Sequence, residues 1–325
     1  MRYAIYSPNG TLTDKEGSHR TAWAYMRADQ ISRASGIDVD IIYTKNEKKT
    51  DWSAYDNIIV YMGMEWRGAL NLFGGASDEN LAKFTRLLDF GGRIQWLDER
   101  PIGLGDLVAK RWPNFDKDTL NRLAESAPVV TQPASEYIIL GDSHALNWYV
   151  PGASVLRHDG KTLFGALESG ISSFLEYVPE ELAIGFGNID IRHHLNRQPH
   201  PLNSLVDMVK QLDMQLLALQ ANEGCGIQLI QPIYIENESR KLPQTGFYKG
   251  TPFYGSWETR DYLRRRMDEL YYELCEKNGW TYLTYPKYFR NALGEMDFDY
   301  MEKPGSVHVS WDHGRMNRLL RGEEL

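Results

Sequence analysis

The sequence has too few cysteines to build a disulfide framework. Only two of its 325 residues are cysteines, Cys225 and Cys275, and neither has the CxxC spacing typical of a metal site. No apolar run approaches the roughly 18 residues that a membrane helix requires. The first residues, MRYAIYSPNG, lack the pattern of a secretory signal. These absences predict a cytoplasmic protein with no membrane contact, and nothing in the sequence calls for a metal.

Glycine motifs for nucleotide binding are also missing. The sequence contains neither GxGxxG nor a Walker-type phosphate loop, which argues against an ordinary dinucleotide or NTPase site. The net charge of -8 argues against a general nucleic-acid-binding surface. The negative excess lies after residue 130, so an anionic partner would bind more easily to the first part of the chain. Apolar residues make up 42% and charged residues 25%, as is typical of a globular protein.

Alternating strand and helix patterns predict an α/β fold in both halves of the chain. Strand-like apolar runs alternate with amphipathic helical patterns up to residue 99, and a second series begins at residue 136. Such alternation favours doubly wound parallel sheets with functional groups at the carboxyl ends of the strands. We therefore expect two Rossmann-like or flavodoxin-like domains, at 1–105 and 136–325, that face a shared cleft. Residues 106–135, in a proline-containing stretch without this rhythm, are predicted to connect them.

A serine follows the first strand of the second series. The apolar run YIIL stops at the sequence GDSH, residues 141–144, which places Ser143 at the carboxyl end of a strand. Backbone N–H groups at such a position can stabilise developing negative charge. Serine needs a base to act as a nucleophile, and His308 and His313 near the C-terminus are candidates. Alternatively, Gly-Asp-Ser forms only a turn and a helix cap, with Asp142 as the capping residue.

Three short motifs in the second half carry a family resemblance. GDSH at 141–144, GNID at 187–190 and VH at 307–308 resemble, in order and spacing, the conserved blocks of the SGNH (GDSL-type) hydrolase superfamily. The resemblance covers roughly residues 135–325. It implies that Ser143 is the nucleophile, Asn188 an oxyanion donor and His308 the base. The pattern differs at Gly305, because the family usually has an acid three residues before the histidine.

The second motif also differs from the family pattern, because GNID continues into the polar sequence IRHH. Arginine forms paired hydrogen bonds with phosphate and sugar oxygens, so this segment could bind a phosphate or a sugar hydroxyl. A structural role is an equally good interpretation of the two histidines. The residues of the second half that we predict to bind substrate or donor are Gly141, Asp142, His144, Asp190, Arg192 and His193.

The first half resembles the N-terminal, acceptor domain of T-even phage DNA β-glucosyltransferase. The matching pieces include YDNIIVYMG at 55–63, NLFGG at 71–75 and FTRLLDFGGRIQWLDERP at 84–101. The resemblance implies that Asp98, or Glu99 if the alignment shifts by one, is a catalytic base for a hydroxymethyl group in DNA. Arg100 would hold the carboxylate or a phosphate. The alternative is a structural pair between the strand-end acid and Arg100.

The loop after the first strand would lie at the same edge of the sheet. It supplies His19 and Arg20 as further candidate binding residues, with Glu16 beside them. The second half does not resemble the sugar-nucleotide domain of the glucosyltransferase family. The resemblance of the first half therefore leaves the donor undefined.

Three functional hypotheses remain open from the sequence. The first is a phage-type DNA-modifying transferase that glycosylates a 5-hydroxymethylpyrimidine, or a sugar already on it, in double-stranded DNA. No cofactor is certain, and a nucleotide-sugar donor fits this hypothesis. The second is an SGNH-type serine esterase or O-acyltransferase that acts on an acylated carbohydrate through Ser143, Asn188 and His308. The third is a carbohydrate- or nucleotide-binding protein with a degenerate site.

Overall fold

The computed structural model divides the chain into two compact units, residues 1–133 and 134–325. It describes residues 1–10, 12–13, 19–63, 77–236, 250, 253–302 and 307–310, with only the backbone of residues 19 and 20. Each unit is an α/β structure built on a five-stranded sheet, and each is described by itself below. The predicted fold class is confirmed. The shared cleft stays a prediction.

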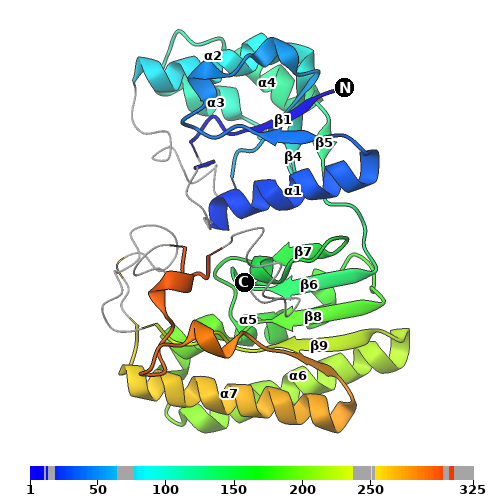
Figure 1. Cartoon of the computed structure of the whole chain (residues 1–325), viewed down its shortest axis with the longest axis vertical. Coiled ribbons are helices and arrows are strands. Elements are labelled where there is room, and N and C mark those ends of the chain that lie inside the picture. Colours follow the sequence, from blue (N-terminus) through cyan, green and yellow to red (C-terminus); the bar gives the residue numbers. More distant parts are fainter. Residues whose placement is uncertain are drawn as a thin grey trace. The chain divides into compact units, whose positions relative to one another are not determined.

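The first unit contains a parallel sheet in the order β2-β1-β3-β4-β5 (Figure 1). Its strands are β1 (Tyr3–Tyr6), β2 (Val39–Ile41), β3 (Asn57–Val60), β4 (Ile94–Leu97) and β5 (Val129–Val130). The central strands are almost entirely apolar, as expected where both faces of a parallel sheet are covered. Ile5, Ile59 and Trp96 are fully buried.

Helices cover both faces of the first sheet (Figure 1). Helix α1 (His19–Ser35) lies on one face. The other face packs against α2 (Asp78–Phe90), α3 (Leu104–Ala109) and α4 (Lys117–Ser126) in one apolar core. Helix α2 begins where the Ser77 side chain accepts a hydrogen bond from the Asn80 N–H at 3.2 Å. It ends at Gly91, whose φ of 52° is unfavourable for other residues.

The predicted connecting segment, 106–135, is largely an integral part of the first unit. Helices α3 and α4 contribute Val108, Leu120 and Ala124 to its core, and β5 pairs with β4. The prolines that concealed this pattern lie between the elements. Pro113 follows α3 and Pro128 separates α4 from β5, which are positions where a missing N–H and a fixed φ are tolerated.

The second unit repeats the strand order of the first. Its parallel sheet has the order β10-β9-β8-β6-β7. The strands are β6 (Tyr137–Gly141), β7 (Ser154–Arg157), β8 (Glu181–Gly185), β9 (Gly226–Ile230) and β10 (Thr281–Leu283). Counted from the start of each unit, both sheets therefore read 2-1-3-4-5, the flavodoxin-like order. Strand β7 is an element that the sequence did not reveal.

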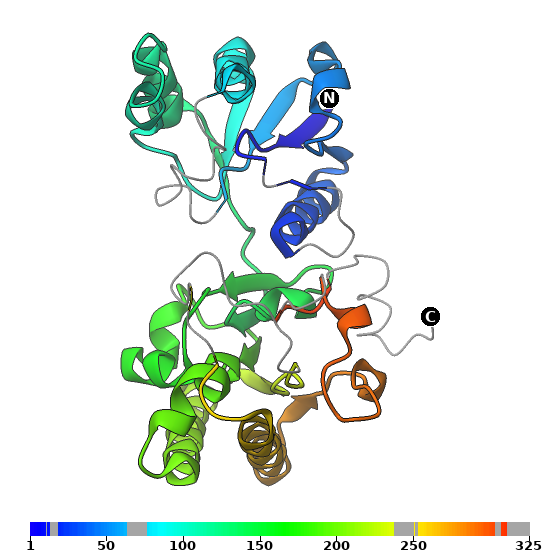
Figure 2. The same cartoon turned by 90° about the vertical axis from the view of Figure 1, so that its left-hand side faces the viewer.

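Three helices share one core with the second sheet: α5 (Leu163–Ser169), α6 (Pro201–Glu223) and α7 (Trp257–Asn278). Helices α6 and α7 run beside each other along one face of the sheet (Figure 2). Both end at a glycine with positive φ, Gly224 and Gly279, which is the usual way to terminate an α-helix. Helix α5 had not been assigned from the sequence.

The strand order locates the expected ligand site of the second unit. In an open parallel sheet, ligands bind at the carboxyl ends of the strands where the order reverses. Here that point lies between β6 and β8, which pair from Tyr137↔Glu181 to Gly141↔Gly185. The GDSH sequence follows β6, and Asn188 follows β8. Both motifs therefore meet at this edge of the sheet.

Candidate active site

Ser143 is the one accessible side chain in an otherwise buried turn. Residues 141–149 are buried apart from Ser143, which is partly exposed. A side chain at Gly141 would overlap the carbonyl oxygen of Gly185 on β8, so only glycine allows the two strands to pair this closely. The sequence thus directs a single hydroxyl group out of the carboxyl end of β6.

A histidine from the C-terminal part of the chain contacts this serine. His308 Nε2 lies 2.9 Å from Ser143 Oγ, a normal hydrogen-bond distance. His308 precedes the buried residue Val309, which forms an antiparallel bridge with Met301. The structure thus brings together Ser143 and His308, which are 165 residues apart. His313, the other candidate base, lies outside the described residues.

An acid that sequence analysis missed faces the other nitrogen of His308. Glu302 Oε1 lies 3.6 Å from His308 Nδ1, and the Glu302 N–H donates to the His308 carbonyl at 3.1 Å. Position 305, where the family pattern has its acid, lies outside the described residues. Glu302 is six residues before His308 rather than three. The only sequence signal for it was an acidic residue close to the histidine.

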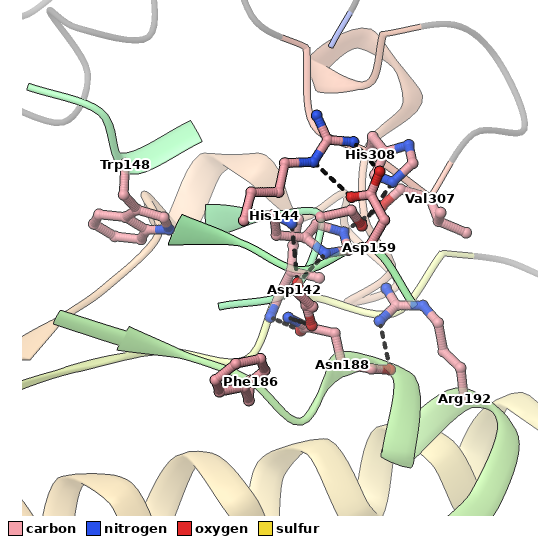
Figure 3. A network of polar contacts seen from close by, with 12 residues as sticks. Asp142, His144, Trp148, Asp159, Phe186, Asn188, Arg192, Val307 and His308 are labelled. Atoms are coloured by element: carbon pink, nitrogen blue, oxygen red, sulfur yellow. Dashed lines mark hydrogen bonds and ion pairs between the residues drawn. The ribbon is translucent and has the colours of Figure 1, made fainter. Parts of the chain in front are cut away.

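Asp142 organises the turn from a fully buried position. Its Oδ1 accepts hydrogen bonds from the backbone N–H of His144 at 2.9 Å and from its ring Nδ1 at 3.1 Å, and its Oδ2 accepts one from Asn188 Nδ2 at 3.0 Å (Figure 3). Burial raises the pKa of the Asp142 carboxyl, but the contacts with His144 and Asn188 outweigh it and hold the pKa below its usual range. Asp142 is therefore an ionised structural group rather than the predicted ligand-binding residue.

Asn188 is held in place from both ends of its amide. Its Nδ2 donates to Asp142, and its Oδ1 accepts the N–H of Ile233 at 3.0 Å. The bond to Asp142 takes one of the two hydrogens on Nδ2. The hydrogen bond from Ile233 to Oδ1 therefore fixes which way the amide points. The second hydrogen on Nδ2 is not used in the bond to Asp142.

Asp190, a predicted ligand-binding residue, contacts backbone groups of the fold. It is buried at the N-terminus of α5, where it accepts the Leu163 N–H at 2.6 Å and the Phe164 N–H at 3.2 Å. A carboxylate there satisfies backbone groups that would otherwise lack partners. Burial raises the pKa of Asp190 to about 6, although the backbone hydrogen bonds oppose the rise. Asp190 is thus a helix-capping residue.

This raised pKa predicts a specific dependence of stability on pH. At pH values between 3.8, the ordinary pKa of an aspartate, and about 6, Asp190 carries a proton in the folded protein but not in the unfolded chain. Stability should therefore fall as pH rises through that window. Relative to Asp190→Asn, the wild-type free energy of unfolding should decrease by at most about 3 kcal/mol between about pH 4 and 6.5. Urea unfolding of both proteins measures this. Parallel pH curves would contradict it.

Arg192 is bound to an internal acid instead of being available to a phosphate. Its guanidinium nitrogens lie 2.8 to 3.2 Å from the carboxylate of Glu236, and both side chains are buried. Arg192 Nη1 also donates to the Asn188 carbonyl at 3.0 Å (Figure 3). The predicted binding role of Arg192 is replaced by a structural one: it neutralises Glu236 and supports the backbone of Asn188.

The two neighbouring histidines pack within the fold. His193 is buried, and its ring centroid lies 5.4 Å from that of Phe253 and 6.4 Å from that of His194. Burial, with a smaller effect from Arg197, lowers the pKa of His194. The structural interpretation of this histidine pair fits these contacts better than the predicted binding role of His193.

In the first unit, Asp98 follows β4 with a φ of 68°, a conformation uncommon for residues other than glycine. Its carboxylate accepts hydrogen bonds from Trp23 and from the buried Arg27. Arg100, the expected partner, donates instead to the Ala127 carbonyl at 3.3 Å. Asp98 is thus fixed by two side chains of α1 rather than by Arg100.

Of the other candidate site residues of the first unit, the structure describes the side chain of Glu99 but not those of Glu16, His19 and Arg20. Glu99 is exposed. Glu16, the segment 71–75 and the side chains of His19 and Arg20 lie outside what the structure describes. Among the described residues no helix is both long and apolar enough to cross a membrane. The same residues contain no group of three or more His, Cys, Asp or Glu side chains that could hold a metal ion.

Comparisons with known proteins give structural neighbours for part of the chain. No protein-family model and no curated protein matches the sequence. A putative platelet activating factor structure from Streptococcus pneumonia is 14% identical, with a TM-score of 0.42, and the match covers 58% of this chain and 82% of that one. A GDSL-like lipase from Bacteroides thetaiotaomicron is 11% identical, with a TM-score of 0.41 and coverage of 59% and 90%.

A putative acylhydrolase from Bacteroides fragilis is 16% identical, with a TM-score of 0.38 and coverage of 57% and 84%. Two of these three structures, the GDSL-like lipase and the acylhydrolase, carry the names of hydrolases. Because the TM-scores are below 0.5, any functional assignment has to rest on the geometry of the site itself.

Proposed function

We propose that the second unit is a serine hydrolase of the SGNH type that cleaves carboxylic esters. The observation that carries the proposal is the 2.9 Å contact between Ser143 Oγ and His308 Nε2, with Glu302 facing Nδ1 of the same ring. A hydroxyl, an imidazole and a carboxylate in this order make up the arrangement that activates a serine nucleophile.

In this proposal each of the three residues has a role in the reaction. His308 accepts the hydroxyl proton of Ser143 through Nε2 as the oxygen attacks the ester carbonyl, and later donates it to the leaving alcohol. This requires the tautomer with hydrogen on Nδ1, which the negative charge of the Glu302 carboxylate, 3.6 Å from that nitrogen, favours. Glu302 also stabilises the imidazolium that forms. Water then releases the acyl group by the same steps.

Three donors could stabilise the negatively charged oxygen of the intermediate. Within the described part of the chain, the backbone N–H groups of Ser143 and Gly187 donate to no other residue. Asn188 Nδ2 supplies the third donor through its second hydrogen. Gly187 has a φ of 106°, and an added Cβ would lie 2.5 Å from Met267 Sδ, so glycine is required there. Such donors contribute strongly to acyl-transfer catalysis.

The transferase hypothesis has less support than the esterase hypothesis. The three neighbours described above are named as a platelet activating factor, a lipase and an acylhydrolase, and none of these names is that of a DNA glycosyltransferase. The proposed base of that reaction, Asp98, is engaged by Trp23 and Arg27. We therefore do not propose that the protein modifies DNA or binds a nucleotide-sugar.

Hydrolysis of p-nitrophenyl acetate and p-nitrophenyl butyrate by the full chain tests the proposed function. We expect turnover above the spontaneous rate, increasing with pH as His308 loses its proton, because only the neutral ring can act as base. Turnover at the spontaneous rate across a series of acyl chain lengths would contradict the proposal.

Glu302 should contribute strongly to the rate. In Glu302→Gln the amide cannot stabilise the His308 imidazolium, so kcat for ester hydrolysis should fall by about tenfold to a thousandfold. Asp299→Asn is the matched control, because Asp299 is an exposed acid in the same segment. Its kcat should stay close to the wild-type value. Equal activity of both variants would show that Glu302 has no catalytic role.

A further inference from the structure

His144 connects the serine turn to the segment that carries His308. Its ring Nδ1 lies 3.1 Å from Asp142 Oδ1, and its Nε2 lies 2.8 Å from the carbonyl oxygen of Val307. Val307 directly precedes His308, and the ring centroids of His144 and His308 are 5.3 Å apart. Figure 3 shows His144 lying between Asp142 and Val307. His144 itself is only 5% exposed.

The partners of His144 specify its protonation. A backbone carbonyl and an ionised carboxylate only accept hydrogen bonds, so both contacts form together only if both ring nitrogens carry hydrogen. His144 is then an imidazolium beside the Asp142 carboxylate. The pair is neutral overall, which is the condition under which buried charges are tolerated.

The bridge acts on a segment that is also bonded to residues 300–302. The His308 carbonyl accepts the Glu302 N–H at 3.1 Å, and the Ser310 N–H donates to the Tyr300 carbonyl at 2.7 Å. These bonds hold the segment together without setting its distance from β6. The His144–Val307 contact does set that distance, one residue away from His308.

We infer that His144 is a positioning residue: it bridges Asp142 and the Val307 carbonyl and thereby holds His308 Nε2 within reach of Ser143 Oγ. The inference rests on the proposed function, since it assigns His308 as the base. It predicts that the contact with Val307 matters more for catalysis than the contact with Asp142. Asp142 keeps two other donors, the backbone N–H of residue 144 and Asn188.

Two substitutions of His144 each keep only one of its two contacts, with Val307 or with Asp142. In His144→Gln the amide nitrogen can take the place of Nε2 and still donate to Val307. In His144→Asn the shorter amide can take the place of Nδ1 and contact only Asp142. We expect the glutamine variant to keep kcat for ester hydrolysis within about fivefold of wild type. The asparagine variant should lose about tenfold to a hundredfold in kcat with KM nearly unchanged.

Hydrogen–deuterium exchange provides a readout that does not depend on activity. The amides of Glu302 and Ser310 should exchange faster in His144→Asn than in wild type, and close to the wild-type rate in His144→Gln. Equal exchange and equal kcat in the two variants would overturn the inference. If the wild type does not hydrolyse esters, the proposed function fails, and the exchange rates alone then decide whether His144 positions the segment.

A measurement on the wild-type protein covers the case in which a variant does not fold. Nitrogen-15 NMR of the histidine rings at pH 7 should show both nitrogens of His144 carrying hydrogen. A His144 ring with a single hydrogen would contradict the bridge, because one of its two contacts could then not form.

Discussion

Replacement of Ser143 by alanine should reduce kcat for ester hydrolysis by about 10³-fold to 10⁶-fold, because the reaction loses its nucleophile. The folded structure should change little. Ser143 is partly exposed, and its side chain gives up one hydrogen bond, to His308, worth on the order of 1 kcal/mol. Steady-state kinetics with p-nitrophenyl butyrate, together with a thermal unfolding curve, measure both quantities.

Ser173→Ala serves as the matched control for this experiment. Ser173 is an exposed serine of the same unit whose hydroxyl donates to the Gly170 carbonyl. Its substitution should leave kcat unchanged. Hydrolysis that persists in Ser143→Ala at the wild-type rate would exclude Ser143 as the nucleophile and would assign the activity to another group.

Replacement of Arg192 by methionine should destabilise the second unit by about 3 to 5 kcal/mol. The substitution leaves the Glu236 carboxylate, which is 0% exposed, without its charged partner. Removal of one member of a buried ion pair is costly because the remaining charge has no water around it. Denaturant unfolding monitored by tryptophan fluorescence measures the loss.

A double substitution separates the cost of leaving Glu236 buried and unpaired from the net contribution of the ion pair to stability. Arg192→Met combined with Glu236→Leu removes both charges and should recover most of the lost stability. Arg265→Met is the exposed control, since Arg265 is 57% exposed and pairs with Asp261 on the surface of α7. It should cost less than about 1 kcal/mol. An equally small cost for Arg192→Met would contradict the structural role of the buried pair.

Much of the fold could be predicted because buried parallel strands have a simple sequence pattern. Runs such as YAIY, IIV and YIIL are apolar throughout, and they form β1, most of β3 and most of β6. Long helical patterns at residues 201–220 and 258–279 likewise predict the helices α6 and α7. Length and repetition of the pattern made these elements recognisable.

Short elements carried too little pattern to be recognised. Strand β5 has two residues and α3 has six, and prolines lie on both sides of them. Strand β5 is defined by its pairing with β4, a contact that depends on tertiary structure. Local propensity cannot supply such information, so the sequence of residues 106–135 predicts a connecting segment.

In the site, too, some residues are recognisable from local sequence motifs, whereas the roles of others depend on partners that are distant in the sequence. The order of the three motifs suggested that Ser143, Asn188 and His308 belong to one site, and the structure brings their elements to the same sheet edge. The roles of Asp190 and Arg192 could not be seen, because their partners are the start of α5 and Glu236. Glu236 is 44 residues away from Arg192 in sequence.

A polar residue next to a motif looks the same in sequence whether it binds a ligand or a buried partner. For Arg192 the deciding fact is the internal acid, and for Glu302 it is the antiparallel bridge between Met301 and Val309 close to His308. Both are consequences of packing between distant segments. This explains why the proposed nucleophile and base were easier to nominate than the proposed acid and the supporting residues.

Reaction with a fluorophosphonate probe, followed by peptide mass spectrometry, tests most directly whether Ser143 is an activated nucleophile. Such probes phosphonylate a serine hydroxyl that a neighbouring base deprotonates. We expect one adduct, on Ser143, in the wild-type protein, and a labelling rate at least about a hundredfold lower in His308→Gln. An unmodified Ser143 peptide in the folded wild-type protein, or labelling that does not depend on His308, would contradict the account.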